Sequence, residues 1–218
     1  ILTIRRFPAK PITMEQLLHM GALTEECRNM LKKSVEDGCN ILVSGGTGSG
    51  KTTFLNVLAG FIPEAERVIT IEDSAELQIR NIPNLVKLET RNANVEGCTE
   101  ITIRDLIKAS LRMRPDRIIV GEVRGKETID MLQSVNVGHS AMTTVHANSV
   151  RDVVSRLETM VLMGMEMPIS AIRRQIASGF HLLVHLGRLR DGSRRVLEIA
   201  RPLGFREGEV EMETIYRF

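Results

Sequence analysis

The sequence has 218 residues, which is long enough for one ordinary domain with a substantial core. Lys and Arg total 29 and Asp and Glu total 27, and the resulting net charge of +2 argues against a protein that coats nucleic acid through bulk charge. A hydrophobic content of 43% excludes a disordered chain, and an aromatic content of 3% disfavours a module that stacks single-stranded bases.

The first part of the chain predicts a linker followed by two helices. Residues 1–6 alternate like the end of a strand, and the prolines of Pro8–Pro11 interrupt any regular structure. Thr13, followed by Gln16, matches a capping box at a helix start. A second helix is predicted over 24–36.

Strand and helix patterns then alternate through the middle of the chain. Short apolar runs bounded by turn residues predict strands, and longer periodic runs predict helices. This alternation is typical of an α/β fold with a mostly parallel sheet that helices cover on both faces. The predicted strands are 40–44, 67–71, 85–89, 117–120 and 141–145, and the predicted helices are 51–61, 102–112, 126–137, 150–163 and 168–178.

The last forty or so residues have a different pattern. Three runs, over 181–190, 194–201 and 210–218, predict antiparallel strands, and Asp191-Gly192 is a favourable hairpin turn. We therefore expect residues 1–12 to be a linker from a preceding domain, 13–178 the α/β domain, and 179–218 its β-rich extension. Because the sequence begins with Ile1 and not Met, we also expect it to be a piece of a longer protein.

Cysteine usage and hydropathy indicate the compartment. Cys27, Cys39 and Cys98 are far apart and form no CxxC pair, as expected in a reducing environment. No apolar stretch approaches the roughly 20 residues that cross a bilayer, and no signal peptide is recognisable. We expect a cytoplasmic protein.

A glycine-rich segment carries the strongest functional signal. Residues 45–52 (GGTGSGKT) fit the pattern G-x-x-x-x-G-K-[ST], and they follow a predicted strand and open a predicted helix. Glycines let backbone N–H groups converge on phosphate oxygens, and the helix N-terminus favours negative charge. Lys51 is expected at the β- and γ-phosphates, Thr52 at Mg²⁺ and Thr53 at the α-phosphate. The predicted nucleotide-binding residues are Gly46, Thr47, Gly48, Ser49, Gly50, Lys51, Thr52 and Thr53.

The sequence lacks the motif that recognises guanine, and this favours adenine as the base of the nucleotide. A GTPase normally carries an Asn-Lys-x-Asp segment that reads guanine, and this sequence has none. ATP with Mg²⁺ is therefore the favoured ligand.

Two acidic segments follow predicted strands. Glu122 ends the strand run IIVGE and is expected to hold Mg²⁺ through water or to polarise the attacking water. Glu72 ends the run ITIE and is a candidate general base. In the alternative interpretation, Glu122 is a solvated strand end, and Asp73 and Ser74 cap a helix.

Histidines flank the strand predicted over 141–145. His146 follows its carboxyl end and is expected to contact the γ-phosphate, whereas His139 precedes its other end and is equally well explained as a structural histidine. The two are too far apart to share a metal, so we assign no zinc site.

Several arginines bracket the acidic strand, and a P-loop ATPase often needs a guanidinium on the developing charge. Arg104 and Arg112 are our leading candidates, although any one arginine is as readily a salt-bridge residue. The set is Arg91, Arg104, Arg112, Arg114 and Arg124. A second arginine-rich stretch, 188–206, is interpreted either as a solvated hairpin edge or as a contact for an acidic partner or lipid surface.

Four segments together resemble the secretion "traffic" ATPases, the hexameric motors of type II and type IV secretion and type IV pili. GGTGSGKTT, RVITIEDSAEL, LRMRPDRIIVGEVRG and GHSAMTTVHANS resemble their Walker A, Asp box, Walker B and His box in order. The stretch ITIRDLIKASLRMRPDRIIVGEVRG is most similar to the branch that drives Flp/Tad pili. The similarity extends to about Arg156, and Ser140 departs from the glycine that often follows the first histidine of the His box.

The resemblance implies a RecA-like ATPase domain in which Glu122 and Glu72 take part in hydrolysis and His146 lies near the γ-phosphate. It also implies that Arg5 lies near the nucleotide. The domain expected to precede it closes over the nucleotide in the family, so the present chain is expected to hydrolyse ATP poorly.

The expected function is an ATP-hydrolysing subunit of a homo-hexameric motor that acts on an inner-membrane pilus or secretion platform protein, with no direct nucleic-acid partner. One alternative is a nucleic-acid-stimulated RecA-like NTPase. Another is a nucleotide-sensing regulator with little turnover.

Overall fold

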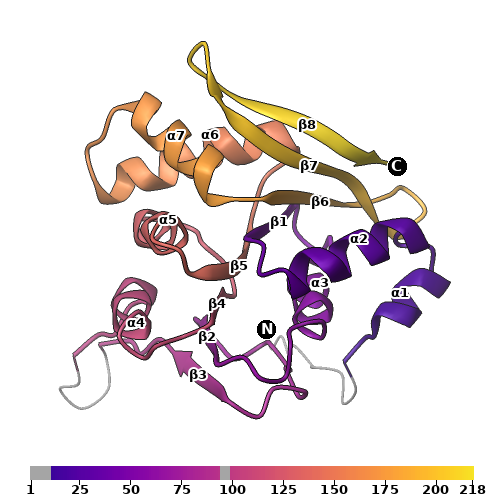
Figure 1. Cartoon of the computed structure of the whole chain (residues 1–218), viewed down its shortest axis with the longest axis horizontal. Coiled ribbons are helices and arrows are strands. Elements are labelled where there is room, and N and C mark those ends of the chain that lie inside the picture. Colours follow the sequence, from indigo (N-terminus) through magenta and orange to yellow (C-terminus); the bar gives the residue numbers. More distant parts are fainter. Residues whose placement is uncertain (1–10, 94–98) are drawn as a thin grey trace, which may run out of the picture.

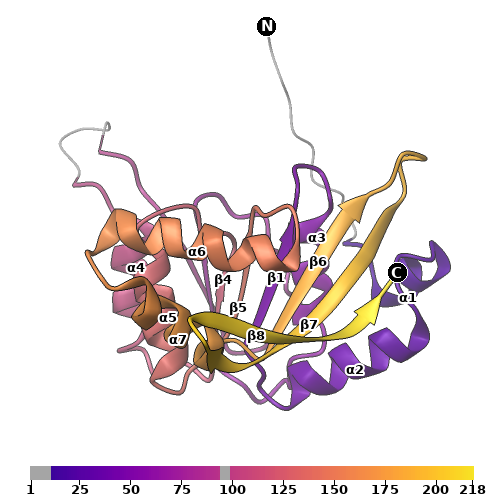
Figure 2. The same cartoon turned by 90° about the horizontal axis from the view of Figure 1, so that it is seen from above.

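The structure, a computed structural model, describes residues 11–93 and 99–218 and consists of a single twisted sheet with helices on both faces (Figures 1 and 2). The sheet has 8 strands in the order β3-β2-β4-β5-β1-β6-β7-β8. The strands are β1 Ile41–Gly45, β2 Val68–Glu72, β3 Leu85–Glu89, β4 Arg117–Val120, β5 Ser140–Val145, β6 Leu182–Arg188, β7 Arg194–Arg206 and β8 Glu209–Arg217. The helices are α1 Met14–His19, α2 Glu25–Glu36, α3 Lys51–Ala59, α4 Ile103–Ser110, α5 Thr128–Asn136, α6 Val150–Gly164 and α7 Ile169–Gly179.

The central strands are short apolar segments with both faces covered. Every residue of β1, β2 and β4 is buried, as expected when helices pack on both sides of a parallel sheet. One core cluster lies between the sheet and α4–α7, and it contains Leu42 of β1. The other lies between the sheet and α1–α3, and it contains the neighbouring Ile41 and Val43. The predicted fold class is therefore confirmed, because successive residues of β1 enter opposite cores.

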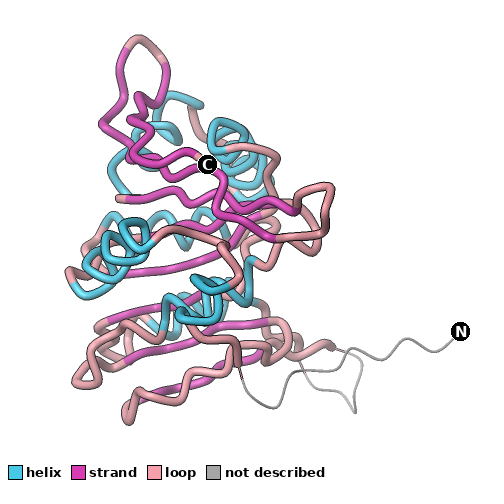
Figure 3. The backbone as a smooth tube through the Cα atoms, turned by 90° about the vertical axis from the view of Figure 1, so that its right-hand side faces the viewer, coloured by secondary structure: helices cyan, strands magenta, loops and turns pink. Residues whose placement is uncertain are grey.

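The C-terminal strands extend the parallel sheet with an antiparallel ribbon, which is visible in Figure 3 as the long strands at one end of the molecule. β6 pairs antiparallel with β7, and β7 with β8, as the sequence predicts. However, β6 also pairs in parallel with β1, with Gly45 opposite Leu186. The sequence does not predict this parallel pairing, which arises because α7 carries the chain back to the amino end of the sheet before β6 begins.

The predicted turn and cap signals appear where the sequence places them. Thr13 and Gln16 form a complete capping box at α1. Asp191 Oδ1 accepts hydrogen bonds from the backbone N–H and the hydroxyl of Ser193, and Gly192 has a φ of +85° in the β6–β7 turn. The strand predicted over 1–6 lies outside the described residues. In the described part of the chain, no helix combines the length and apolar character that a membrane crossing requires.

The parallel topology gathers the functional segments at one edge. β1, β2, β4 and β5 run in the same direction, so their carboxyl ends, at Gly45, Glu72, Val120 and Val145, lie at the same edge of the sheet. The loops that follow these strands therefore meet there.

A buried arginine fixes the opposite edge of the sheet. Arg117, the first residue of β4, has a fully buried side chain. Its Nε and Nη2 donate to the Glu66 carboxylate at 2.8 and 2.9 Å, and Nη2 also donates to the backbone oxygen of Val35 at 2.9 Å. This guanidinium thus ties β4 to the end of α2 and to the loop before β2.

We expect Arg117→Met to lower the free energy of unfolding by about 3 kcal/mol, because it removes the buried charged partner of the Glu66 carboxylate and one donor to the Val35 carbonyl, which keeps the Gly38 N–H. Chemical denaturation followed by circular dichroism measures this change. Arg112→Ala is the matched control, since the exposed Arg112 precedes the same strand, and its effect should stay within about 0.5 kcal/mol. A loss below about 1 kcal/mol in Arg117→Met would contradict the structural importance of this arginine.

Candidate nucleotide-binding site

The loop between β1 and α3 has the backbone conformation of a phosphate cradle. Gly45, Gly48 and Gly50 have φ values of +154°, +72° and +95°, which favour glycine. At Gly45, a Cβ would lie 2.5 Å from the Leu186 backbone oxygen and 2.5 Å from Ser49 Oγ, so no larger residue fits. At Gly46 and Gly48, a Cβ would meet nothing within 4 Å, so the inside of the loop is open. Lys51 begins α3, which places the helix N-terminus directly at the cradle.

A cavity of about 780 Å³ opens above this loop. Its floor is formed by the loop and the first turn of α3, and one wall carries charged side chains. The other wall comes from α1, the residues beside it and the β6–β7 hairpin. Its lining includes Thr47 to Phe54, then Glu76, Glu122, Arg124, His146, Arg194 and Arg195, and the apolar Ile12, Leu17, Met20, Ala22, Leu186 and Val196. The volume and this combination of polar and apolar lining residues suit a nucleotide.

Lys51 lies at the floor of the cavity and is buried, with 8% of its surface exposed. Its Nζ donates to the backbone oxygen of Gly46 at 3.2 Å and lies 3.3 Å from His146 Nε2. Burial lowers the pKa of Lys51, and the Glu122 carboxylate opposes this shift. The ammonium group is therefore held by weak partners, which phosphate oxygens can replace with stronger charge-assisted hydrogen bonds.

Glu122 and His146 meet at this lysine from neighbouring strands. His146 Nε2 lies 3.0 Å from Glu122 Oε1, and Arg124 binds the other carboxylate oxygen, Oε2, through Nε at 2.7 Å and Nη2 at 2.5 Å. Burial, and then the nearby Lys51 charge, lower the pKa of His146, so the neutral imidazole is favoured at neutral pH. The structure thus brings together three predicted residues, Lys51, Glu122 and His146.

Glu72 occupies a different position from the one its predicted role requires. It is only 5% exposed and does not line the cavity, and its Oε1 accepts hydrogen bonds from the backbone N–H groups of Glu76 and Leu77 at 3.0 Å each. Burial raises the pKa of this carboxyl, and the two backbone hydrogen bonds oppose that effect. No helix follows Glu72 in the structure, so the alternative in which Asp73 caps one is wrong. Glu72 instead shapes the loop that carries Glu76.

Of the predicted arginines, Arg124 lines the cavity at the phosphate loop, whereas the two leading candidates, Arg104 and Arg112, do not. Arg104 in α4 lies 2.6 Å from Asp130 of α5, in an ion pair that joins the two helices. Arg112 follows α4 and precedes β4, which puts it at the edge of the sheet away from the phosphate loop. Arg104, in the first turn of α4, lines a neighbouring pocket with Asp73 and Arg124, and neither it nor Arg112 lines the cavity at the phosphate loop. Their role in hydrolysis stays a prediction. Arg5 lies outside the described residues.

His139 precedes β5 at that same far edge, as the sequence predicts. It lies a whole strand away from His146, so the two histidines belong to different environments.

The residues present fit a nucleotide with Mg²⁺. The open glycine cradle and Lys51 suit the phosphates, and Thr52, in the first turn of α3, lines the same cavity as Glu122. In residues 11–93 and 99–218, no group of three or more His, Cys, Asp or Glu side chains forms a metal site. A magnesium ion would therefore be held mainly by phosphate oxygens and Thr52, with Glu122 acting through water.

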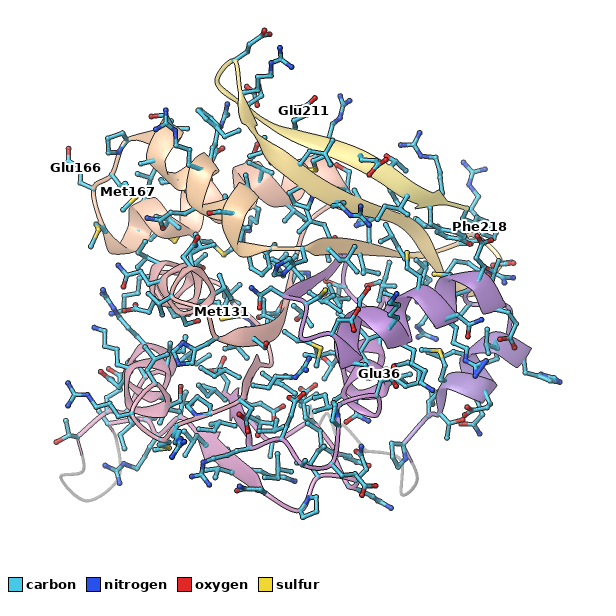
Figure 4. The ribbon with its side chains drawn as sticks, in the orientation of Figure 1. Glu36, Met131, Glu166, Met167, Glu211 and Phe218 are labelled. Atoms are coloured by element: carbon cyan, nitrogen blue, oxygen red, sulfur yellow. The ribbon has the colours of Figure 1, made fainter. Side chains whose placement is uncertain are left out.

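Sequence reasoning missed the apolar wall and one arginine. Leu17 of α1, Met20 just after it, and Leu186 and Val196 of the hairpin line the cavity, although the two pairs are more than a hundred residues apart in sequence. Arg194 also lines the cavity. It belongs to the arginine-rich stretch 188–206, for which the sequence suggests either a hairpin edge or a contact for a partner. Figure 4 draws the side chains as sticks and labels Glu211 in β8 and Phe218, the last residue of the chain, which follows β8.

Comparison with known proteins places the chain among secretion proteins. Residues 1–201 match the family described as Type II/IV secretion system protein. The chain is 42% identical over 210 residues to the putative conjugal transfer protein Rv3659c of Mycobacterium tuberculosis strain H37Rv, an alignment that covers 95% of this chain and 59% of that protein. It is 33% identical over 215 residues to the conjugal transfer protein TrbB of Rhizobium radiobacter, over 97% of this chain and 63% of that protein. The chain thus spans less than two thirds of the length of either relative.

Two solved structures have a similar fold. The VirB11 ATPase of the Brucella suis type IV secretion system, crystallised with sulphate, superposes with a TM-score of 0.73 at 34% identity, over 88% of this chain and 57% of that one. The pilus retraction motor PilT with bound ADP gives a TM-score of 0.65 at 25% identity, over 90% of this chain and 53% of that one.

Proposed function

Because this chain belongs to the type II/IV secretion system protein family, we propose that it is the ATP-hydrolysing part of a motor that drives pilus assembly or protein secretion across the inner membrane. The observation that carries the proposal is the convergence of Lys51, His146 and Glu122 over an open glycine cradle, with contacts of 3.0–3.4 Å. The relatives named above as ATPase and motor support the same activity.

In the proposed reaction, water attacks the γ-phosphate of ATP and gives ADP and inorganic phosphate. The loop amides and Lys51 hold the phosphates, and Glu122 accepts a hydrogen bond from the attacking water. His146 holds the Glu122 carboxylate at one oxygen and so orients it. Mg²⁺, when bound, would neutralise charge between the β- and γ-phosphates.

The proposed assembly is a homo-hexameric ring, in which an arginine of one subunit serves the nucleotide of its neighbour. Arg104 and Arg112 lie away from their own phosphate loop, and this position is compatible with action across a subunit boundary. The ring would lie at the cytoplasmic side of the inner membrane and contact a platform protein there. We place the motor in the Flp/Tad pilus branch on the strength of the segment ITIRDLIKASLRMRPDRIIVGEVRG.

The proposal is tested by release of inorganic phosphate from ATP by the intact natural protein, alone, with vesicles that contain its membrane platform, and with DNA. We expect turnover that membranes stimulate and DNA does not. Tight ATP binding without phosphate release would favour the nucleotide-sensing regulator. Stimulation by DNA alone would favour the nucleic-acid-stimulated NTPase.

A further inference from the structure

The β6–β7 hairpin lies beside the phosphate-binding loop. β6 continues the parallel sheet next to β1, with Leu186 opposite Gly45, and Arg194 begins β7 opposite Arg188. The hairpin and the loop therefore leave the sheet at the same edge, and Figure 2 shows them rising at the same end of the molecule.

One side chain of the hairpin contacts the loop. Arg194 Nε donates a hydrogen bond to the backbone oxygen of Gly48 at 2.8 Å. Its Cδ lies 3.3 Å from the position that a Cβ on Gly50 would occupy. The arginine thus lies against the two glycines on either side of Ser49, and it lines the same cavity as Lys51.

This hydrogen bond acts on a peptide of the cradle that has open space on its Cα side. Gly48 has a φ of +72°, and a Cβ there would meet nothing within 4 Å, so side-chain packing at this residue does not hold the peptide in one orientation. The carbonyl of Gly48 and the N–H of Ser49 belong to one planar peptide unit and point in opposite directions. Holding the carbonyl toward Arg194 therefore turns the Ser49 N–H toward the inside of the loop. That N–H donates to Gly46 oxygen at a long 3.3 Å, a bond that a phosphate oxygen can replace.

We propose that Arg194 is a positioning residue for nucleotide binding, which preorganises the phosphate-binding loop by holding the Gly48 carbonyl outward. The inference rests on the proposed function in one respect only, namely that the loop binds a nucleotide. It makes the β6–β7 hairpin, 140 residues beyond the loop in sequence, part of the nucleotide site. The arginine-rich stretch 188–206 then contains at least one residue that serves the chain's own ligand and not an outside partner.

The test compares Arg194→Ala with Arg190→Ala, because Arg190 is an exposed arginine of the same hairpin that does not line the cavity. Affinities for ADP and for a non-hydrolysable ATP analogue, both with Mg²⁺, are measured by calorimetry. We expect Arg194→Ala to weaken both ligands by about tenfold and by the same factor, since the loop amides bind phosphates that both ligands share. Arg190→Ala should stay within twofold of the unmodified chain.

Hydrogen–deuterium exchange of the nucleotide-free chain adds a readout that general destabilisation would not reproduce. Uptake should rise in peptides covering residues 45–50 of Arg194→Ala and not in those covering β4 or β5. Equal affinities in Arg194→Ala and the unmodified chain would overturn the inference while leaving the proposed function intact. Weakening of the ATP analogue alone would also overturn it, because Arg194 would then contact the γ-phosphate directly. Failure of the unmodified chain to bind either ligand would overturn both.

Discussion

Lys51→Ala should weaken the binding of ATP and ADP by roughly 100-fold, the largest effect we expect on affinity. The side chain lies at the floor of the cavity, and among the described residues its ammonium has hydrogen-bond contacts with a carbonyl oxygen and an imidazole. Two charge-assisted hydrogen bonds to phosphate, each contributing about 1.5 kcal/mol, correspond to a factor of this size. Titration with a fluorescent ADP analogue measures it.

Lys32→Ala provides the matched control for that variant, because Lys32 lies on the surface of α2 in an exposed pair with Glu36. Its affinity should equal that of the unmodified chain. Thermal unfolding in the absence of nucleotide should be similar for both variants, whereas added ADP should stabilise only the control. If Lys51→Ala bound ADP within threefold of the unmodified chain, the assignment of the glycine-rich loop as the phosphate site would be lost.

Glu122→Gln should reduce the rate of ATP hydrolysis by 10²-fold to 10⁴-fold and leave nucleotide affinity within about threefold, measured in the intact natural protein. The amide keeps the size of the side chain and an oxygen that can face His146, but it cannot accept a proton from water. Arg124 would lose its anionic partner and retain Asp73, which lies 3.7 Å from its Nη1. Single-turnover phosphate release separates this loss from slow product release.

Glu89→Gln is the control for this substitution, because Glu89 ends β3 at the same edge of the sheet and is exposed. It should hydrolyse ATP at the normal rate. Glu72→Gln is the informative comparison. Its amide oxygen can still accept the N–H groups of Glu76 and Leu77, so we expect at most a few-fold loss of turnover. A loss of turnover as large as that of Glu122→Gln would support Glu72 as the general base.

Local sequence signals predict the side of the cavity formed by the glycine-rich loop, Glu122 and His146, and not the side formed by α1 and the β6–β7 hairpin. The glycine-rich loop is recognised from the sequence pattern alone, because phosphate binding by backbone amides requires several glycines within one short segment. Glu122 and His146 are found by a slightly longer argument, since each follows an apolar run and parallel strands end at one edge. Only a topology of parallel strands is needed to bring these three segments together.

Two features of the site depend on tertiary structure. Arg112 closely precedes the acidic strand in sequence, yet it lies at the edge of the sheet where β4 begins, away from the phosphate loop. Glu72 has the right position at the end of its strand, but its carboxylate turns away from the cavity to satisfy two backbone N–H groups that would otherwise be buried without acceptors. Neither the position of the arginine nor the orientation of the Glu72 carboxylate can be predicted from the spacing of residues in the sequence.

The amino-acid sequence alone determined the alternation of strands and helices, the glycine cradle and the family, because each depends on residues within one short segment. The tertiary structure alone decided that β6 joins the parallel sheet beside β1. It alone placed α1 and the β6–β7 hairpin across the cavity from the acidic wall, and Arg194 against Gly48. These contacts join segments more than a hundred residues apart, and the packing of the whole sheet fixes them, so no local pattern carries them.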